Sequence, residues 1–385
     1  MLYFVLLGVS FLAAAVEGAN FSGPSIQQIT PPVDHAEGPT WDGRKNILYF
    51  VDIHYGGVLA YHYDTNKLTR VTLNGEVSPV VPSRKDPNIL LVGLNRSVVA
   101  IEWDGNLALG GQQVLATVSK DHPTSRFNDG KADKQGRLWW GTIGYESPTG
   151  DLNMYEAYFY KITKENLDNP TIVKAPVSNS NGLAWNKANN KLYYIDTPTR
   201  KIVEFVYDDD LGVLSKENRT AFDVDLYPGK ITGYPDGMTI DEDDNLWICL
   251  YGGGSVIKAN PTTGELLKVV PIPARDVTSA MWGGPDLDIL FVTTSKHSLS
   301  DTEKVQQPGA GSVYAITNLG TKGLPVFTAD IIDSIAKRRN ILDNIFNAEI
   351  FAPLAPREQT NNIVYPQNNE IPLWRTIMKT IRSFF

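Results

Sequence analysis

A short pattern recurs six times along this chain, and it constrains the fold more than any other feature. In the clearest copies a polar residue and a glycine precede a short apolar strand, a polar turn and a second strand rich in aromatic and β-branched residues. Four strong copies occupy residues 37–52, 129–141, 181–196 and 236–248, and two weaker ones occupy residues 78–92 and 279–292. The copies start roughly 40 to 55 residues apart, which is the period of four-stranded propeller blades.

The repeat predicts the fold class and the limits of the domains. We expect an all-β chain, a six-bladed β-propeller with a C-terminal, partly helical extension, because helical periodicity is absent from the repeated region. Residues 25–29 could add the outer strand of the last blade and close the ring, leaving no free sheet edge. The predicted segments are a signal peptide at 1–19, the propeller at 20–330 and the extension at 331–385.

The two ends of the chain carry separate predictions. An apolar run from Tyr3 to Val16, followed by small residues, is typical of a cleaved signal peptide and favours secretion, although no Lys or Arg precedes the run. The last residues would form an amphipathic helix with one apolar face, made by Trp374, Ile377, Met378, Ile381 and Phe385. Such a helix could touch a membrane surface or a partner, or pack on its own domain.

Composition and net charge limit the classes of partner that the chain could bind. A net charge of −8 argues against nucleic acid, whose phosphates need a basic face, and leaves a small-molecule substrate as the expected ligand. The single cysteine, Cys249, excludes an intramolecular disulfide and lies in an apolar strand, so we expect a core thiol. Three glycosylation sequons start at Asn20, Asn95 and Asn218. The sequence does not indicate an oligomeric state.

The residue before each repeat's glycine is the strongest candidate for chemistry. In the four strong copies it is Glu37, Asp129, Asn181 or Asp236, and equivalent positions of successive blades should face the same axial space. Carboxylate and amide oxygens that converge there suit one divalent metal ion, Ca²⁺ above all, with Zn²⁺, Mn²⁺ or Mg²⁺ as other options. The alternative is that Asp-Gly and Asn-Gly mark turns for backbone reasons alone.

Other chemistries find less support. The five histidines show no zinc-binding spacing, and no Gly-x-Ser-x-Gly motif is present. His35 is close to Glu37 in sequence, but we expect a structural role for it. Arg126 and Asn128 would flank the axial cup and could contact a polyhydroxylated or anionic substrate, or Arg126 could form a surface ion pair.

Several motifs, in the same order along the chain, resemble those of the senescence-marker-protein/regucalcin/gluconolactonase family, which includes insect luciferin-regenerating enzymes. The resemblance runs from about His35 to about Ile316 and rests on four motifs, which are Glu37-Gly-Pro-Thr-Trp, Arg126-Phe-Asn-Asp-Gly-Lys, Ser180-Asn-Gly-Leu and Pro235-Asp-Gly-Met. It implies a six-bladed propeller, one Ca²⁺ or Zn²⁺ site and hydrolysis of sugar lactones.

The resemblance also assigns residue roles. It implies Glu37, Asn181 and Asp236 as metal ligands and Asp236 as the acid/base residue. Arg126, Asn128 and Glu146 are the implied substrate contacts, so that Asn128 takes precedence over the adjacent Asp129 chosen by the repeat. The leading hypothesis is therefore a metal-dependent hydrolase of lactones or related esters. The alternatives are a secreted calcium- or ligand-binding propeller without turnover, and a hydrolase of organophosphate esters that uses the same site.

Overall fold

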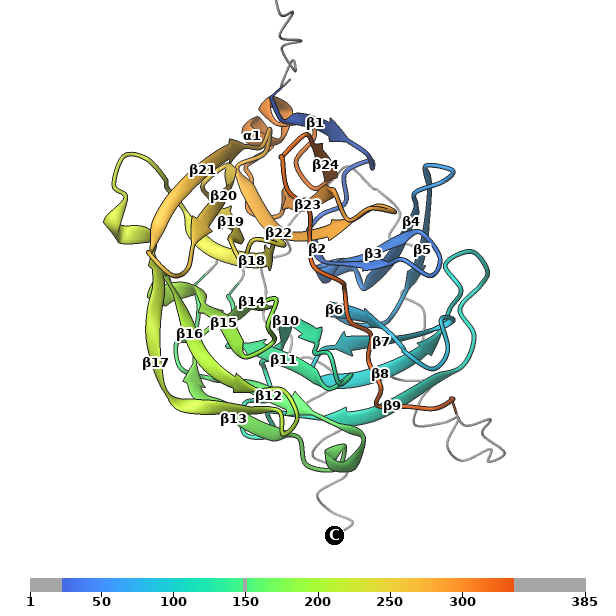
Figure 1. The fold of residues 1–385 in the computed structure, drawn as a ribbon. Coiled ribbons are helices and arrows are strands. Elements are labelled where there is room, and N and C mark those ends of the chain that lie inside the picture. Colours follow the sequence, from blue (N-terminus) through green and yellow to red (C-terminus); the bar gives the residue numbers. More distant parts are fainter. Residues whose placement is uncertain (1–22, 148–150, 336–385) are drawn as a thin grey trace, which may run out of the picture. The chain divides into compact units, whose positions relative to one another are not determined.

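The computed structural model confirms the six-bladed propeller. It describes residues 23–147 and 151–335, so the predicted signal peptide, Asn20 and the predicted C-terminal helix lie outside the described residues. Six four-stranded antiparallel sheets surround one axis, and the first strand of each blade is the innermost (Figure 1). Within the described residues, no helix is long and apolar enough to span a membrane.

The strands follow one another from the axis outward in blades 1 to 5. Blade 1 contains β2 (Ala36–Asp42), β3 (Ile47–Asp52), β4 (Gly57–His62) and β5 (Lys67–Thr72). Blade 2 contains β6 (Val77–Pro82), β7 (Ile89–Leu94), β8 (Ser97–Glu102) and β9 (Gln112–Thr117). Blade 3 contains β10 (Arg126–Ala132), β11 (Leu138–Ile143), β12 (Ala157–Ile162) and β13 (Thr171–Val177). Blade 4 contains β14 (Ser180–Trp185), β15 (Lys191–Asp196), β16 (Lys201–Asp208) and β17 (Val213–Asp223). Blade 5 contains β18 (Tyr234–Ile240), β19 (Leu246–Tyr251), β20 (Ser255–Asn260) and β21 (Glu265–Pro271).

The sixth blade joins the two ends of the propeller. It contains β22 (Asp276–Gly283), β23 (Ile289–Ser295), β24 (Val313–Thr317) and, outermost, the N-terminal β1 (Ser25–Gln28). Antiparallel pairing of Gln28 with Tyr314 and of Ser25 with Thr317 closes the ring, as the sequence predicted. Short helices lie in the connections: η1 (Ile53–Tyr55), η2 (Lys164–Asn166), η3 (Thr197–Thr199), η4 (Val224–Leu226) and α1 (Asp301–Gln306).

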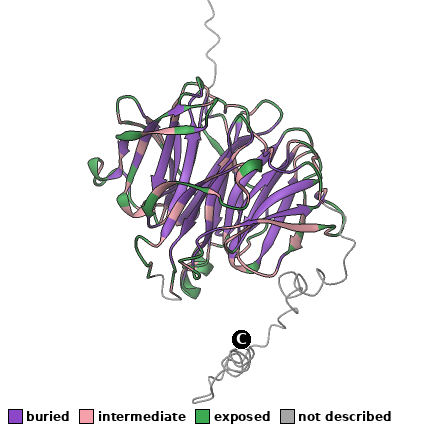
Figure 2. Cartoon of the chain, turned by 90° about the horizontal axis from the view of Figure 1, so that it is seen from below, coloured by how far each residue is buried: buried purple, intermediate pink, exposed green. Residues whose placement is uncertain are grey.

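The core consists of six apolar clusters, one between each pair of neighbouring blades. In the cluster between blades 2 and 3, for example, Leu91 packs with Phe127 and Trp140. Both faces of a blade are therefore covered, which explains why second strands such as β3 are apolar at nearly every position instead of alternating. Outer strands such as β21 alternate between exposed and covered residues, and Figure 2 shows buried strands inside and exposed residues at the rims and loops. Cys249 is buried in β19, as predicted.

After β24 the chain crosses one face of the ring as a strap, residues 319–332 (Figure 1). Its backbone binds four blades in turn: Gly323 donates to the Leu287 carbonyl, Glu242 donates to Lys322, Ala329 donates to Pro82 and Asp330 donates to Gly136, all at 2.8–2.9 Å. Ile331 and Ile332 are buried against blades 2 and 3. The propeller therefore uses residues slightly beyond the predicted boundary at 330.

Candidate metal centre

The six inner strands share one irregularity at the same point of the repeat. Pairing between the first two strands is interrupted by a β-bulge between Glu37 and Thr40 in blade 1 and between Ser180 and Leu183 in blade 4. Equivalent interruptions occur in the other blades at 77–80, 127–130, 235–238 and 277–280. The polar residue–glycine pairs therefore lie within the inner strands and do not form hairpin turns. A bulge at this point redirects the side chains beside it.

The glycines of these motifs let the inner strands of neighbouring blades pack closely. Gly38 has a φ of +56°, a left-handed conformation that side chains disfavour. Gly182 has an ordinary conformation, but a Cβ there would lie 2.7 Å from the backbone oxygen of Asp236 in the next blade. The motifs therefore need glycine so that inner strands of adjacent blades can approach closely and bring their preceding polar residues together.

Three carboxylates of the inner strands are buried and close enough for their charges to interact. Glu37, Asp129 and Asp236 are only 4–7% exposed. Burial, followed by the nearby charges of Asp236 and Asp129, raises the pKa of Glu37 well above its usual range. Burial and the charge of Asp129 do the same to the pKa of Asp236. Burial also raises the pKa of Asp129, against the opposing charge of Lys131. Without a cation, this cluster favours protonated carboxyls.

Asn181 adds a neutral oxygen to the cluster. Its Nδ2 donates to Thr197 Oγ1 at 3.0 Å, and its side chain also hydrogen-bonds to Asp236. The amide oxygen of Asn181 is buried and has no hydrogen-bond partner among the described residues, and neither has Oδ2 of Asp129. Buried, unsatisfied acceptors are costly, so these oxygens fit a hard divalent cation that would satisfy them.

The structure thus brings together the three predicted ligands, whose role remains a prediction. Within residues 23–147 and 151–335, no three His, Cys, Asp or Glu side chains form a metal cluster by themselves. The predicted set consists of two carboxylates, Glu37 and Asp236, and one amide, Asn181.

The adjacent residues Asn128 and Asp129 lie in different surroundings. Asp129 belongs with the buried carboxylates. Asn128 donates from Nδ2 to Asn179 Oδ1 at 2.9 Å and to the Ser180 carbonyl at 3.1 Å, and its Oδ1 accepts from Arg126 Nη1 at 3.0 Å. The side chain predicted to contact substrate is thus held in a network that orients the second predicted contact, Arg126.

Arg126 lies beside the cluster and not on the surface. It is 8% exposed, its Nε lies 3.7 Å from Glu76 Oε2, and its charge acts on Glu37. Glu146, the third predicted contact, is exposed next to residues 148–150, which the structure does not describe. Its charge acts on Tyr251 at the end of β19 and on His297 after β23, so it lies close to blades 5 and 6.

Sequence reasoning missed a cluster of three histidines close to Glu76 and Arg126. The rings of His54 and His297 stack with centroids 4.0 Å apart, and His35 lies 5.3 and 6.1 Å from them. Nδ1 of His54 lies 2.7 Å from Glu76 Oε1, and Nδ1 of His297 lies 2.7 Å from Asp34 Oδ2. His35 and His54 both belong to blade 1, but His297 follows β23 of blade 6, so only the adjacency of blades 1 and 6 could have revealed the whole cluster.

Two further predictions have a place in the structure. Asn95 and Asn218 are exposed, on a hairpin of blade 2 and on β17, but their glycosylation and the secretion of the chain remain predictions.

Lys131, which sequence reasoning did not single out, donates from Nζ to the Met238 carbonyl at 2.6 Å. Burial lowers the pKa of Lys131 to about 8, although the charge of Asp129 opposes this shift.

Comparison with known proteins gives consistent matches. The family model described as "SMP-30/Gluconolactonase/LRE-like region" matches residues 35–296. The chain is 34% identical to regucalcin of Sus scrofa over 76% of this chain and 93% of that protein. It is 33% identical to the putative sugar lactone lactonase YvrE of Bacillus subtilis (strain 168), over 72% of this chain and 89% of that protein.

Solved structures agree with the fold. A luciferin-regenerating enzyme is 32% identical and superposes with a TM-score of 0.73, over 80% of this chain and 100% of the other. A calcium-binding protein, regucalcin, from Agrobacterium tumefaciens has 21% identity and a TM-score of 0.69 over 81% of this chain and 98% of that one, which supports the fold alone.

Proposed function

The chain belongs to the SMP-30/gluconolactonase/LRE-like family, and from this membership together with the axial cluster we propose that it is a metal-dependent hydrolase of sugar lactones or related esters. The observation that carries the proposal is the convergence of Glu37, Asp236 and the unpartnered amide oxygen of Asn181 in one buried place. A relative named as a putative sugar lactone lactonase supports the class of substrate.

The proposed ligands are Glu37, Asn181 and Asp236. A divalent cation held there would supply Lewis-acid chemistry at the scissile carbonyl. In lactone hydrolysis, water adds to that carbonyl and the bond between the carbonyl carbon and the ring oxygen breaks, giving a hydroxy acid. Asp236 takes the proton from the attacking water and returns it to the leaving ring oxygen, so protons balance over the cycle.

The neighbouring polar groups hold the substrate. Arg126 is fixed through Asn128 and Glu76, and its buried guanidinium suits the hydroxyl or carbonyl oxygens of a lactone. Glu146 is exposed in the segment between β11 and β12, and its charge acts on Tyr251 and His297, so a substrate hydroxyl could donate to it there. These groups would orient the lactone and leave the proton transfer to Asp236.

A lactone panel tests the proposal. The purified chain is incubated with glucono-δ-lactone, other sugar lactones and an organophosphate ester, in the presence of Ca²⁺, Zn²⁺ or Mn²⁺, and acid release is followed by pH-stat. We expect hydrolysis of a sugar lactone that disappears on chelation and in Asp236→Ala. Full activity in either case would refute the proposed metal-dependent mechanism. Calcium binding by calorimetry without turnover of any ester would refute hydrolysis itself and favour a binding protein. Glu217→Gln, on the exposed face of β17, is the matched acidic control.

A further inference from the structure

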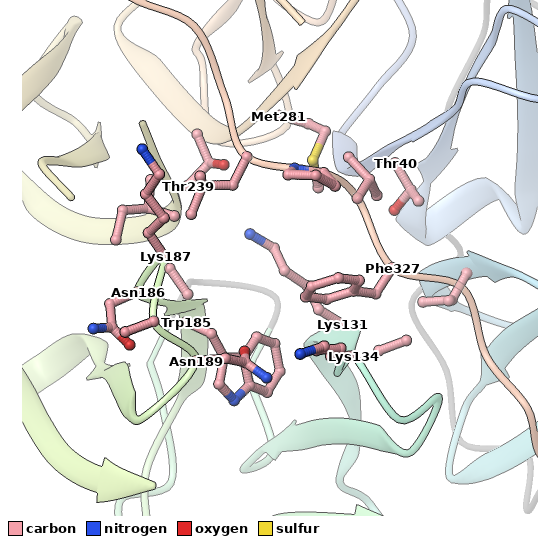
Figure 3. Close-up of a pocket in the computed structure, with 18 residues that line it drawn as sticks. Thr40, Lys131, Lys134, Trp185, Asn186, Lys187, Asn189, Thr239, Met281 and Phe327 are labelled. Atoms are coloured by element: carbon pink, nitrogen blue, oxygen red, sulfur yellow. The ribbon is translucent and has the colours of Figure 1, made fainter. Parts of the chain in front are cut away.

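A cavity lies near the ends of the inner strands that are opposite the carboxylate cluster. Its volume is about 380 Å³, within the range of small-molecule sites in proteins. Its walls come from the last residues of the inner strands, such as Thr40 and Thr239, which lie three positions after Glu37 and Asp236, and from residues 324–327 of the strap. Figure 3 shows Thr40 and Phe327 on one side of this cavity and Lys187 and Asn186 on the other.

The charges around this cavity all have one sign. Among the described residues that line it, three are lysines, Lys131, Lys134 and Lys187, and none is Asp or Glu, although the chain as a whole carries a net charge of −8. An excess of cations inside a concave wall attracts an anion and orients it.

Lys134 and Lys187 are only weakly neutralised, whereas Lys131 is also close to the charge of Asp129. Lys131 donates to the Met238 carbonyl at 2.6 Å and Lys187 donates to the Glu242 carbonyl at 3.2 Å. The carboxylate of Asp209 lies 3.9 Å from Lys134. Since an ammonium group has three N–H donors, these contacts leave donors available for a ligand.

Most of the remaining wall is apolar. It includes Trp185, Met281 and Phe327 together with smaller aliphatic side chains of blades 2 to 5 and the strap. Two buried donors in the same wall, Nε1 of Trp185 and Nδ2 of Asn189, have no acceptor among the described residues. A ligand that fits would combine an apolar body with an acceptor-rich, negatively charged end.

We propose that this cavity is a second binding site, for a small amphipathic carboxylate such as a medium-chain or aromatic acid, with the carboxylate at the lysines and the apolar body against Phe327 and Trp185. The site is separate from the proposed lactone site, because it lies at the opposite ends of the inner strands and on the strap side of the ring. It needs no metal and no catalytic step.

Calorimetric titration of the metal-free full chain with octanoate tests the proposal, with 1-octanol as the uncharged analogue. We expect saturable octanoate binding with one site per chain and at least about tenfold weaker binding of octanol. In Lys134→Gln/Lys187→Gln, octanoate should bind about tenfold more weakly, the effect of two partly screened ion pairs, while octanol binding is unchanged. Phe327→Ala should weaken both ligands, because it removes apolar wall that both use.

A distant substitution provides the control. Lys268→Gln, on the outer strand β21, removes one positive charge away from the residues that line the cavity, and we expect it to bind octanoate as the wild type does. Both exchanged cavity lysines are exposed, so thermal unfolding should show an intact fold. Equal binding of octanoate and octanol, octanoate affinity that the double substitution leaves unchanged, or no saturable binding would each overturn the proposal.

Discussion

Asp236→Asn should make the metal-free protein more stable while removing its response to calcium. In the wild type the folded state raises the pKa of both Glu37 and Asp236. In the unfolded chain the pKa of each carboxyl is about 4. At a pH between the unfolded and the folded pKa, the folded state therefore binds more protons than the unfolded state. The free energy of unfolding therefore falls as the pH rises through this window, and the loss persists at higher pH.

The magnitude follows from the linkage. Each unit by which the fold raises a carboxyl pKa costs the ionised protein about 1.4 kcal/mol, and a domain of this size shifts its Tm by about 2 °C per kcal/mol. Asparagine has no proton to lose and still accepts a hydrogen bond from Asn181. We therefore expect metal-free Asp236→Asn to unfold at least about 2 °C above the wild type at pH 8, and the difference to vanish near pH 4.

Calcium should make the wild type more stable than Asp236→Asn. At a concentration a hundred times its Kd, a ligand that binds only the folded state adds about 2.7 kcal/mol, or about 5 °C here. Differential scanning fluorimetry with chelator and with calcium, at pH 4 to 8, measures both effects, and Glu217→Gln controls for loss of a surface charge. A metal-free Asp236→Asn less stable than the wild type at pH 8, or one stabilised by calcium as the wild type is, would show that these carboxylates do not repel around a vacant cation site.

Four further outcomes are expected. Glu37→Gln should weaken calcium binding at least about tenfold by calorimetry, because one anionic ligand becomes neutral; unchanged affinity would remove Glu37 from the site. Arg126→Gln should raise the KM for a sugar lactone about tenfold with a smaller change in kcat, whereas a fall in kcat alone would place it in the chemistry. Ile26→Asp should lower the Tm by about 2–6 °C through loss of packing in the sixth blade, and unchanged melting would mean that β1 closes the ring without contributing to stability. Peptide N-glycosidase should increase the gel mobility of chain secreted from eukaryotic cells, through glycans on Asn95 and Asn218, and the absence of any shift would argue against use of these sequons.

The repeat made the fold predictable because each blade carries its own copy of the same local signals. The Gly182 and Gly237 motifs mark where inner strands approach one another, and the apolar second strands mark sheets covered on both faces. The same periodicity selected Glu37, Asp129, Asn181 and Asp236 as neighbours, and all four are buried on inner strands.

The rest of the site depends on contacts that no local pattern encodes. His54 and His297 stack only because blades 1 and 6 are neighbours in a closed ring. Lys131 reaches the Met238 carbonyl across the axis from blade 3 to blade 5, and the strap covers the far end of the channel with a segment outside the repeat. The sequence marks neither contact, since each joins elements whose separation in space depends on the whole assembly.

The pairing of β1 with β24 also sets the order in which a newly made chain can finish folding. Ser25 leaves the ribosome early, but its partner Thr317 is synthesised only after all the other blades. Until then the first strand has no neighbour and the sixth blade has an open edge, the kind of edge that promotes pairing with other chains. Completion of the ring is therefore a late event, and termination between β23 and β24 would leave both edges unprotected.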